Sequence, residues 1–167
     1  STNYQTNELD IVNNDQDAGS KVVSAIDPSI YLITYFGHGS IDTWGKDQIL
    51  NGKIINQLPP NLNLPIYMNM TCLSGYFIHS IQESLAEKLL FQKSSGSVTV
   101  IAPTSLTTAD NQKNLSDNFA EQIQDKTNKH LGEVMLKTWQ NMDSSNDAIY
   151  EVMLSFMLFG DPALPIN

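Results

Sequence analysis

The sequence has very few of the residues that build disulfide frameworks or metal clusters. Cys72 is its single cysteine, which excludes an internal disulfide and any zinc site made from paired cysteines. Of the three histidines, His79 and His130 lack the spacing of metal ligands and look like surface or capping residues. We therefore expect no metal site from these side chains, and Cys72 is structural, reactive or neither.

Basic residues are scarce as well. Lys and Arg number 9 against 18 Asp and Glu, which gives a formal net charge of -9. Such a chain has no basic stripe that could neutralise a phosphate backbone, so we expect no nucleic-acid partner. An acidic surface can attract a basic substrate, but it more commonly serves solubility.

Long hydrophobic runs are also missing. The longest apolar stretches have the length of strands, so we expect neither a membrane-spanning segment nor a membrane partner. The chain opens at Ser1 without a start methionine or a leader, and we expect that its original N-terminus has been removed. With 167 residues and 41% hydrophobic content, residues 1–167 are sufficient for one domain with a sizeable core.

Strand-like and helix-like patterns alternate along the chain. Runs rich in β-branched and aromatic residues predict strands, buried on both faces, at residues 30–36, 65–71 and 97–102. Helical spacing of apolar residues appears near residues 22–26, 80–90, 110–123, 134–139 and 150–157. Ser80 and Glu83 form a capping-box start for the second helix, and an edge strand is expected near Leu9. The alternation predicts an α/β sandwich with a mostly parallel sheet.

Two of these strands run directly into residues capable of chemistry. The first ends in Gly37-His38-Gly39 and the second in Thr71-Cys72. Loops at the carboxyl ends of parallel strands converge on one crevice, where a thiol can act as nucleophile and an imidazole as its proton-transfer partner. The glycines let the backbone turn and leave the Gly39 amide free to donate to an oxyanion, with the Cys72 amide as the second donor.

The same residues also have a simpler interpretation. A lone cysteine at the end of a strand is more commonly a buried structural residue, and a lone His-Gly pair is more commonly a turn. Spacing alone therefore leaves the roles of His38 and Cys72 open.

The wider motifs around both residues resemble the gingipain family of cysteine peptidases, which have a caspase-like fold. Tyr35 to Ser40, followed by Trp44-Gly45, looks like the family's histidine motif, and Pro65 to Cys72, followed by Gly75 and Phe77, looks like its cysteine strand. Later segments fit in order at residues 83–90, 97–102, 132–135 and 159–164. In the last of these, the Gly-Asp-Pro motif is expected to be a structural turn that closes the domain.

The resemblance implies a caspase-like three-layer sandwich and a cysteine endopeptidase. Cys72 would be the nucleophile, His38 the general acid/base, and the amides of Gly39 and Cys72 the oxyanion hole, without a tight His–Cys contact before substrate binds. Substrate contacts are expected from neighbours of these motifs, namely Ser40, Trp44, Met70, Thr104 and Ser105. No cofactor is required, although the family is compatible with a structural calcium ion. The partner would be a protein or peptide substrate, and a secreted or cell-surface location is favoured, with a cytoplasmic one left open.

The chain departs from the family at its front. Gingipain catalytic domains have further strands before the histidine strand, so this chain is expected to be the C-terminal portion of such a domain, lacking its first strands. The acidic residues that orient the histidine and select basic side chains would lie in that earlier part. Asp42 and Asp110 are the nearest acidic residues here, and each is more simply a loop or helix-cap residue. The loop 103–109 also lacks the pocket tryptophan of arginine-specific members.

Other functions stay open on the sequence. One is a non-catalytic caspase-like scaffold or regulatory module, or a part-domain that needs the N-terminal part of the same protein or another subunit for activity. Another is a flavodoxin-like ligand-binding domain, for which the Gly37 to Ser40 segment is a poor phosphate loop. An acyltransferase or esterase would use the same His38 and Cys72.

Overall fold

The computed structural model describes residues 5–12 and 15–166, and a four-stranded sheet forms its centre. The strand order is β1 (Leu32–Phe36), β4 (Ile66–Met70), β5 (Thr99–Pro103) and β6 (Phe156–Phe159). The first three are parallel, and β6 pairs antiparallel with β5. A separate antiparallel hairpin joins β2 (Thr43–Trp44) to β3 (Leu50–Asn51). The mostly parallel sheet predicted from the sequence is confirmed.

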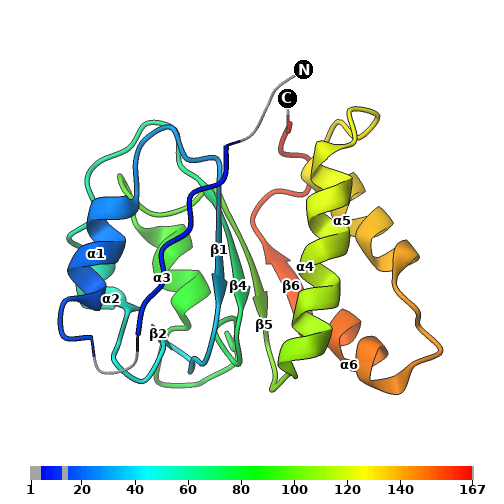
Figure 1. Ribbon diagram of the computed structural model, residues 1–167, viewed down its shortest axis with the longest axis horizontal. Helices are drawn as coiled ribbons and strands as arrows, with labels where there is room; N and C mark the ends of the chain where they lie inside the picture. Colours follow the sequence, from blue (N-terminus) through cyan, green and yellow to red (C-terminus); the bar gives the residue numbers. More distant parts are fainter. Residues whose placement is uncertain (1–4, 13–14, 167) are drawn as a thin grey trace.

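Two groups of helices cover the two faces of the sheet (Figure 1). One layer contains α1 (Ala18–Ala25), α2 (Gly52–Ile55) and α3 (Leu85–Phe91), and the other contains α4 (Ala109–Gln124), α5 (Leu131–Asn141) and α6 (Asp147–Ser155). Each layer has its own apolar cluster, with Tyr67 and Val100 facing the first and Met68 and Ile101 facing the second. Successive strand residues face opposite layers, so every residue of β4 and β5 is buried.

β1 is less buried than its sequence predicts, because it lies at the edge of the sheet. Thr34 and Phe36 are exposed, and Phe36 keeps 55% of its surface accessible. β4 covers one side of β1, and within the described residues no strand covers the other side. The prediction of a strand buried on both faces is therefore wrong for β1. The edge strand expected near Leu9 is also absent, since residues 5–12 form no strand.

The start of α3 is a second correction. Ser84 and Glu87, rather than Ser80 and Glu83, form its capping box: Ser84 Oγ accepts from the Glu87 amide at 3.3 Å, and the Glu87 carboxylate accepts from the Ser84 amide at 2.8 Å. Ile81 lies before the helix and is 92% exposed. The Ser-x-x-Glu pattern occurs twice in succession, and only the second copy contains apolar residues that the core buries, Leu85 and Ala86.

The closing segment follows the prediction in part. Gly160-Asp161-Pro162 forms a turn after β6, as expected for a structural motif. Met157, which its spacing assigned to the last helix, lies in β6 instead. Among the described helices, none has both the length and the apolar character that a membrane crossing requires.

Candidate active site

The carboxyl ends of β1 and β4 bring the His38 and Cys72 loops side by side. The two strands are parallel neighbours, and their register pairs Phe36 with Met70. One residue further on, the Gly37 amide donates to the Met70 carbonyl at 3.2 Å. His38 and Cys72 therefore each lie two positions beyond the last paired residue, at the same edge of the sheet. The predicted adjacency of the two strands is confirmed.

The two loops lie close together at Gly39. A Cβ atom at this position would lie 2.2 Å from Thr71 Oγ1 and 3.0 Å from the Thr43 carbonyl oxygen. Such distances are shorter than van der Waals contact, so only a glycine lets the histidine loop lie against the residue that precedes Cys72. The contact between Gly39 and Thr71 joins the two halves of the site.

Adding a methyl group at Gly39 is expected to push the two loops apart. We expect Gly39→Ala to lower the free energy of unfolding by about 1–3 kcal/mol, the usual cost of overpacking. Gly52→Ala is the matched control, because a Cβ there meets only the flexible Lys88 side chain, at 3.3 Å. Its effect should stay within about 0.5 kcal/mol. Urea unfolding of both variants tests this, and equal losses would contradict a special role for Gly39.

Two backbone amides in these loops donate no hydrogen bond within the described protein. Gly39 pairs with Trp44 in an antiparallel bridge whose hydrogen bonds run from Gly45 to His38 and from Ser40 to Thr43. In this arrangement the N–H of Gly39 is directed away from the hairpin. Across residues 5–12 and 15–166, neither the Gly39 amide nor the Cys72 amide donates a hydrogen bond to protein. Within the described residues, both N–H groups are therefore without a protein acceptor.

The loop after β5 supports the turn that carries Cys72. The Cys72 thiol is half-buried and donates to the Thr107 carbonyl across 3.5 Å. Leu73 adopts a left-handed conformation with φ of 60°, and its amide donates to the Ser105 carbonyl at 3.1 Å. A non-glycine residue in this region is strained and is held by its surroundings, a feature common at functional turns.

His38 is exposed, and its backbone is fixed more firmly than its side chain. The His38 carbonyl accepts from the Gly45 amide at 2.6 Å and from the Tyr35 hydroxyl at 2.8 Å. Burial raises the pKa of Tyr35 to about 12, so this hydroxyl stays a protonated donor at neutral pH. Of the hydrogen bonds and ion pairs of the described residues, none joins the His38 imidazole to the Cys72 thiol.

The residues predicted to contact substrate divide into two groups. Ser40 and Thr104 are partly buried and Ser105 is exposed, so all three have accessible surface near the loops. Met70 is 0% exposed, and Trp44 is 3% exposed and stacks on Tyr35 with ring centroids 4.4 Å apart. These two residues belong to the core, and their burial contradicts the predicted substrate contact. Met70 lies on β4, whose side chains alternate between the two core layers, and Trp44 lies on β2 of the hairpin and packs in the first layer.

The remaining polar candidates have structural roles. His79 Nδ1 accepts from the Gln82 amide at 3.0 Å in the loop before α3, and His130 is the N-cap of α5, which confirms His130 as a capping residue. Asp42 pairs with Lys88 at 3.2 Å, and Asp110 lies exposed in the first turn of α4. Within the described residues, no three His, Cys, Asp or Glu side chains are placed to hold a metal ion. A structural calcium ion stays a prediction.

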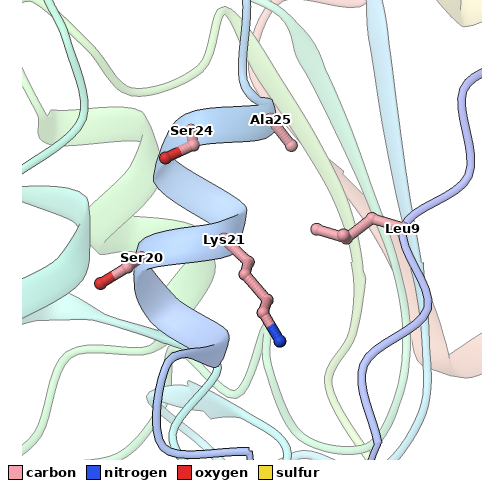
Figure 2. A pocket seen from close by; sticks show the side chains of 5 residues that line it. All are labelled: Leu9, Ser20, Lys21, Ser24 and Ala25. Atoms are coloured by element: carbon pink, nitrogen blue, oxygen red, sulfur yellow. The ribbon is translucent and has the colours of Figure 1, made fainter.

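A depression elsewhere on the molecule has none of the predicted site residues. Figure 2 shows the Leu9 side chain facing α1 across it, and the lining consists of Leu9, Ser20, Lys21, Ser24 and Ala25. Lys21 is paired with Asp15. None of these described lining residues carries a thiol or an imidazole, so we assign this surface no chemistry.

Sequence reasoning missed one residue of the site. Gln112, in the first turn of α4, is only 5% exposed, and its Nε2 donates to the Thr71 carbonyl at 2.9 Å. The available signal was its position on the buried stripe of α4, where Leu115 and Phe119 follow at helical spacing. A polar side chain at such a position needs a hydrogen-bond partner.

Comparison with known proteins places the chain in a family. Residues 1–167 match the model of peptidase family C25. The chain belongs to peptidase family C25. Members of that family with a similar sequence are cysteine peptidases: gingipain R2 of Porphyromonas gingivalis is 26% identical over 154 residues, which cover 87% of this chain and 21% of the relative. For gingipain R1 of Porphyromonas gingivalis the identity is also 26%, over 87% of this chain and 15% of the relative.

Solved structures confirm the caspase-like sandwich of this C25 chain. The crystal structure of the Arg-specific cysteine proteinase gingipain R superimposes with a TM-score of 0.72 at 25% identity, over 88% of this chain and 36% of that one. The complex of Porphyromonas gingivalis RgpB pro- and mature domains gives 0.74 at 24% identity, over 87% and 36%. The chain thus spans well under half of the proteins it matches.

Proposed function

We propose that this chain carries the catalytic pair of a cysteine endopeptidase. Cys72 is the nucleophile, His38 the general acid/base, and the amides of Gly39 and Cys72 form the oxyanion hole. One observation carries the proposal. Adjacent parallel strands place the chain's single cysteine and an exposed histidine on loops that are in contact at Gly39 and Thr71. In the same loops, the amides of Gly39 and Cys72 donate no hydrogen bond to the described protein. Membership of a cysteine peptidase family supports the same assignment.

The chemistry follows from these groups. His38 takes the thiol proton as the Cys72 sulfur bonds to the carbonyl carbon of the scissile peptide. Charge moves onto the carbonyl oxygen, where the N–H groups of Gly39 and Cys72 can donate to it. Collapse of this intermediate breaks the C–N bond, and the leaving amine takes the proton from His38. Water then hydrolyses the thioester and restores the thiol.

The resting thiol needs little reorganisation to react. Its hydrogen bond to the Thr107 carbonyl is long, at 3.5 Å, and sulfur is a weak donor. Leaving this partner costs less than breaking a short bond between stronger groups. The exposed imidazole of His38 is free to adjust when a peptide occupies the crevice, as expected of a pair that meets only around substrate.

Alkylation of the native protein tests the proposal. Iodoacetamide is expected to modify Cys72 without denaturant, because the thiol is only half-buried, and mass spectrometry can assign the adduct to the single thiol. Peptides with Arg, Lys, Asp or Leu before the reporter group are assayed before and after the reaction. Modification should stop cleavage of whichever peptide is a substrate. A Cys72 that reacts only after denaturation, or cleavage that survives full modification, would exclude this nucleophile.

A second candidate is a part-domain whose activity depends on a partner subunit or on a further part of the same protein. The open edge of β1 favours it, since the backbone beside Thr34 and Phe36 has no neighbouring strand within the described residues. Unpaired edges are surfaces for strand pairing. The assay is repeated with a longer form of the same protein. Equal activity of the chain alone and of the longer protein would exclude this dependence.

A further inference from the structure

Two side chains donate hydrogen bonds to one carbonyl oxygen, that of Thr71. The Thr71 carbonyl accepts from Gln112 Nε2 at 2.9 Å and from Thr107 Oγ1 at 3.2 Å. Gln112 Nε2 also donates to Thr107 Oγ1 at 2.7 Å, so the two donors support each other. Gln112 is 5% exposed and its bond to the Thr71 carbonyl is buried, whereas Thr107 is partly exposed.

This carbonyl belongs to the peptide group that ends at the Cys72 nitrogen. In a trans peptide the C=O and N–H vectors point in opposite directions within one plane. Two donors that hold the oxygen on one side therefore fix the direction of the Cys72 N–H on the other side. They also polarise the peptide group, which makes that N–H a stronger donor.

We propose that Gln112 is a positioning residue that, together with Thr107, aims the Cys72 amide at the oxyanion. This inference rests on the proposed peptidase function and adds the residue that prepares its oxyanion hole. Gln112 touches no substrate in this role. Its effect reaches the reaction through the Thr71–Cys72 peptide plane, which a flexible loop would leave free to rotate.

The helix that carries Gln112 also carries a matched control. Gln122 lies further along α4 and is buried to a similar extent, at 7% exposed, without contact to the Thr71 carbonyl. Gln112→Leu and Gln122→Leu therefore make the same change on the same helix. Gln112→Glu keeps the size of the side chain but removes its amide donor. Thr107→Val removes the second donor, and Thr107→Ser restores it.

Two reactions at the Cys72 sulfur separate the oxyanion hole from general damage. Iodoacetamide alkylates sulfur by direct displacement, without an oxyanion. With p-nitrophenyl acetate, a sulfur–carbon bond forms and the bond to p-nitrophenolate breaks through a tetrahedral oxyanion, while the thiol proton leaves through His38. Because the ester is small, its reaction needs no side-chain pocket. Both rates are measured at a single thiol and compared with those of N-acetylcysteine.

The expected result is a selective loss of acylation. Gln112→Leu and Gln112→Glu should slow acylation about tenfold or more while alkylation stays within about twofold, as for a weakened oxyanion donor. Gln122→Leu should change neither rate, and Thr107→Ser should exceed Thr107→Val in acylation. The carbonyl ¹³C resonance of Thr71 should shift in Gln112→Leu and not in Gln122→Leu.

The unfavourable outcomes are distinguishable. If wild-type Cys72 acylates no faster, relative to alkylation, than N-acetylcysteine, the oxyanion hole of the proposed function fails and this inference falls with it. If the wild type is accelerated but Gln112→Leu and Gln112→Glu both behave like Gln122→Leu, only the role of Gln112 is overturned. An unshifted Thr71 carbonyl resonance in a folded Gln112→Leu variant also overturns it.

Discussion

Replacing Cys72 with alanine is expected to abolish peptide hydrolysis while the fold persists. Removal of a nucleophile that acts together with a proton-transfer partner lowers turnover by about 10⁴-fold or more. The change removes one sulfur from a half-buried site, with a single long hydrogen bond at 3.5 Å. Stability should therefore fall by about 1 kcal/mol or less. Hydrolysis of a peptide that the wild type cleaves, together with thermal unfolding, measures both quantities.

A neighbouring serine supplies the comparison for Cys72. Ser80→Ala removes a polar atom from the exposed end of the same loop and should change neither turnover nor stability. Full activity in Cys72→Ala would point to a different nucleophile. A large loss of stability in this variant would instead identify Cys72 as a packing residue.

Replacing His38 with alanine is expected to separate catalysis from stability. Loss of a general acid/base lowers turnover by about 10²–10⁴-fold. His38 is exposed, and the hydrogen bonds of this residue are made by its backbone carbonyl, so the free energy of unfolding should change by less than about 0.5 kcal/mol. Steady-state kinetics and urea unfolding of the same preparation test both expectations.

The other two histidines are controls, because their replacement is expected to leave turnover unchanged. His79→Ala removes the acceptor for the Gln82 amide, and the loss of one such hydrogen bond costs about 1 kcal/mol. Its turnover should match the wild type. His130→Ala, at the N-cap of α5, should likewise leave turnover unchanged. If His79→Ala lost as much activity as His38→Ala, the assignment of the base would be wrong.

Much of this protein follows from its sequence alone. The apolar runs that became β4 and β5, and the polar residues placed directly after two strands, predicted a parallel sheet with His38 and Cys72 at one edge. These features are local: side-chain periodicity defines a strand, and the end of a strand defines where its loop begins.

Only the tertiary structure decided which side chains are accessible and which distant groups meet. Two apolar runs of similar character became the edge strand β1 and the central strand β4, because neighbours rather than composition set burial. Trp44 was buried against Tyr35, and Gln112 reached the Thr71 carbonyl from 41 residues away. Such contacts depend on how helices pack against the sheet. The local periodicity of a segment does not show which other segment it will pack against.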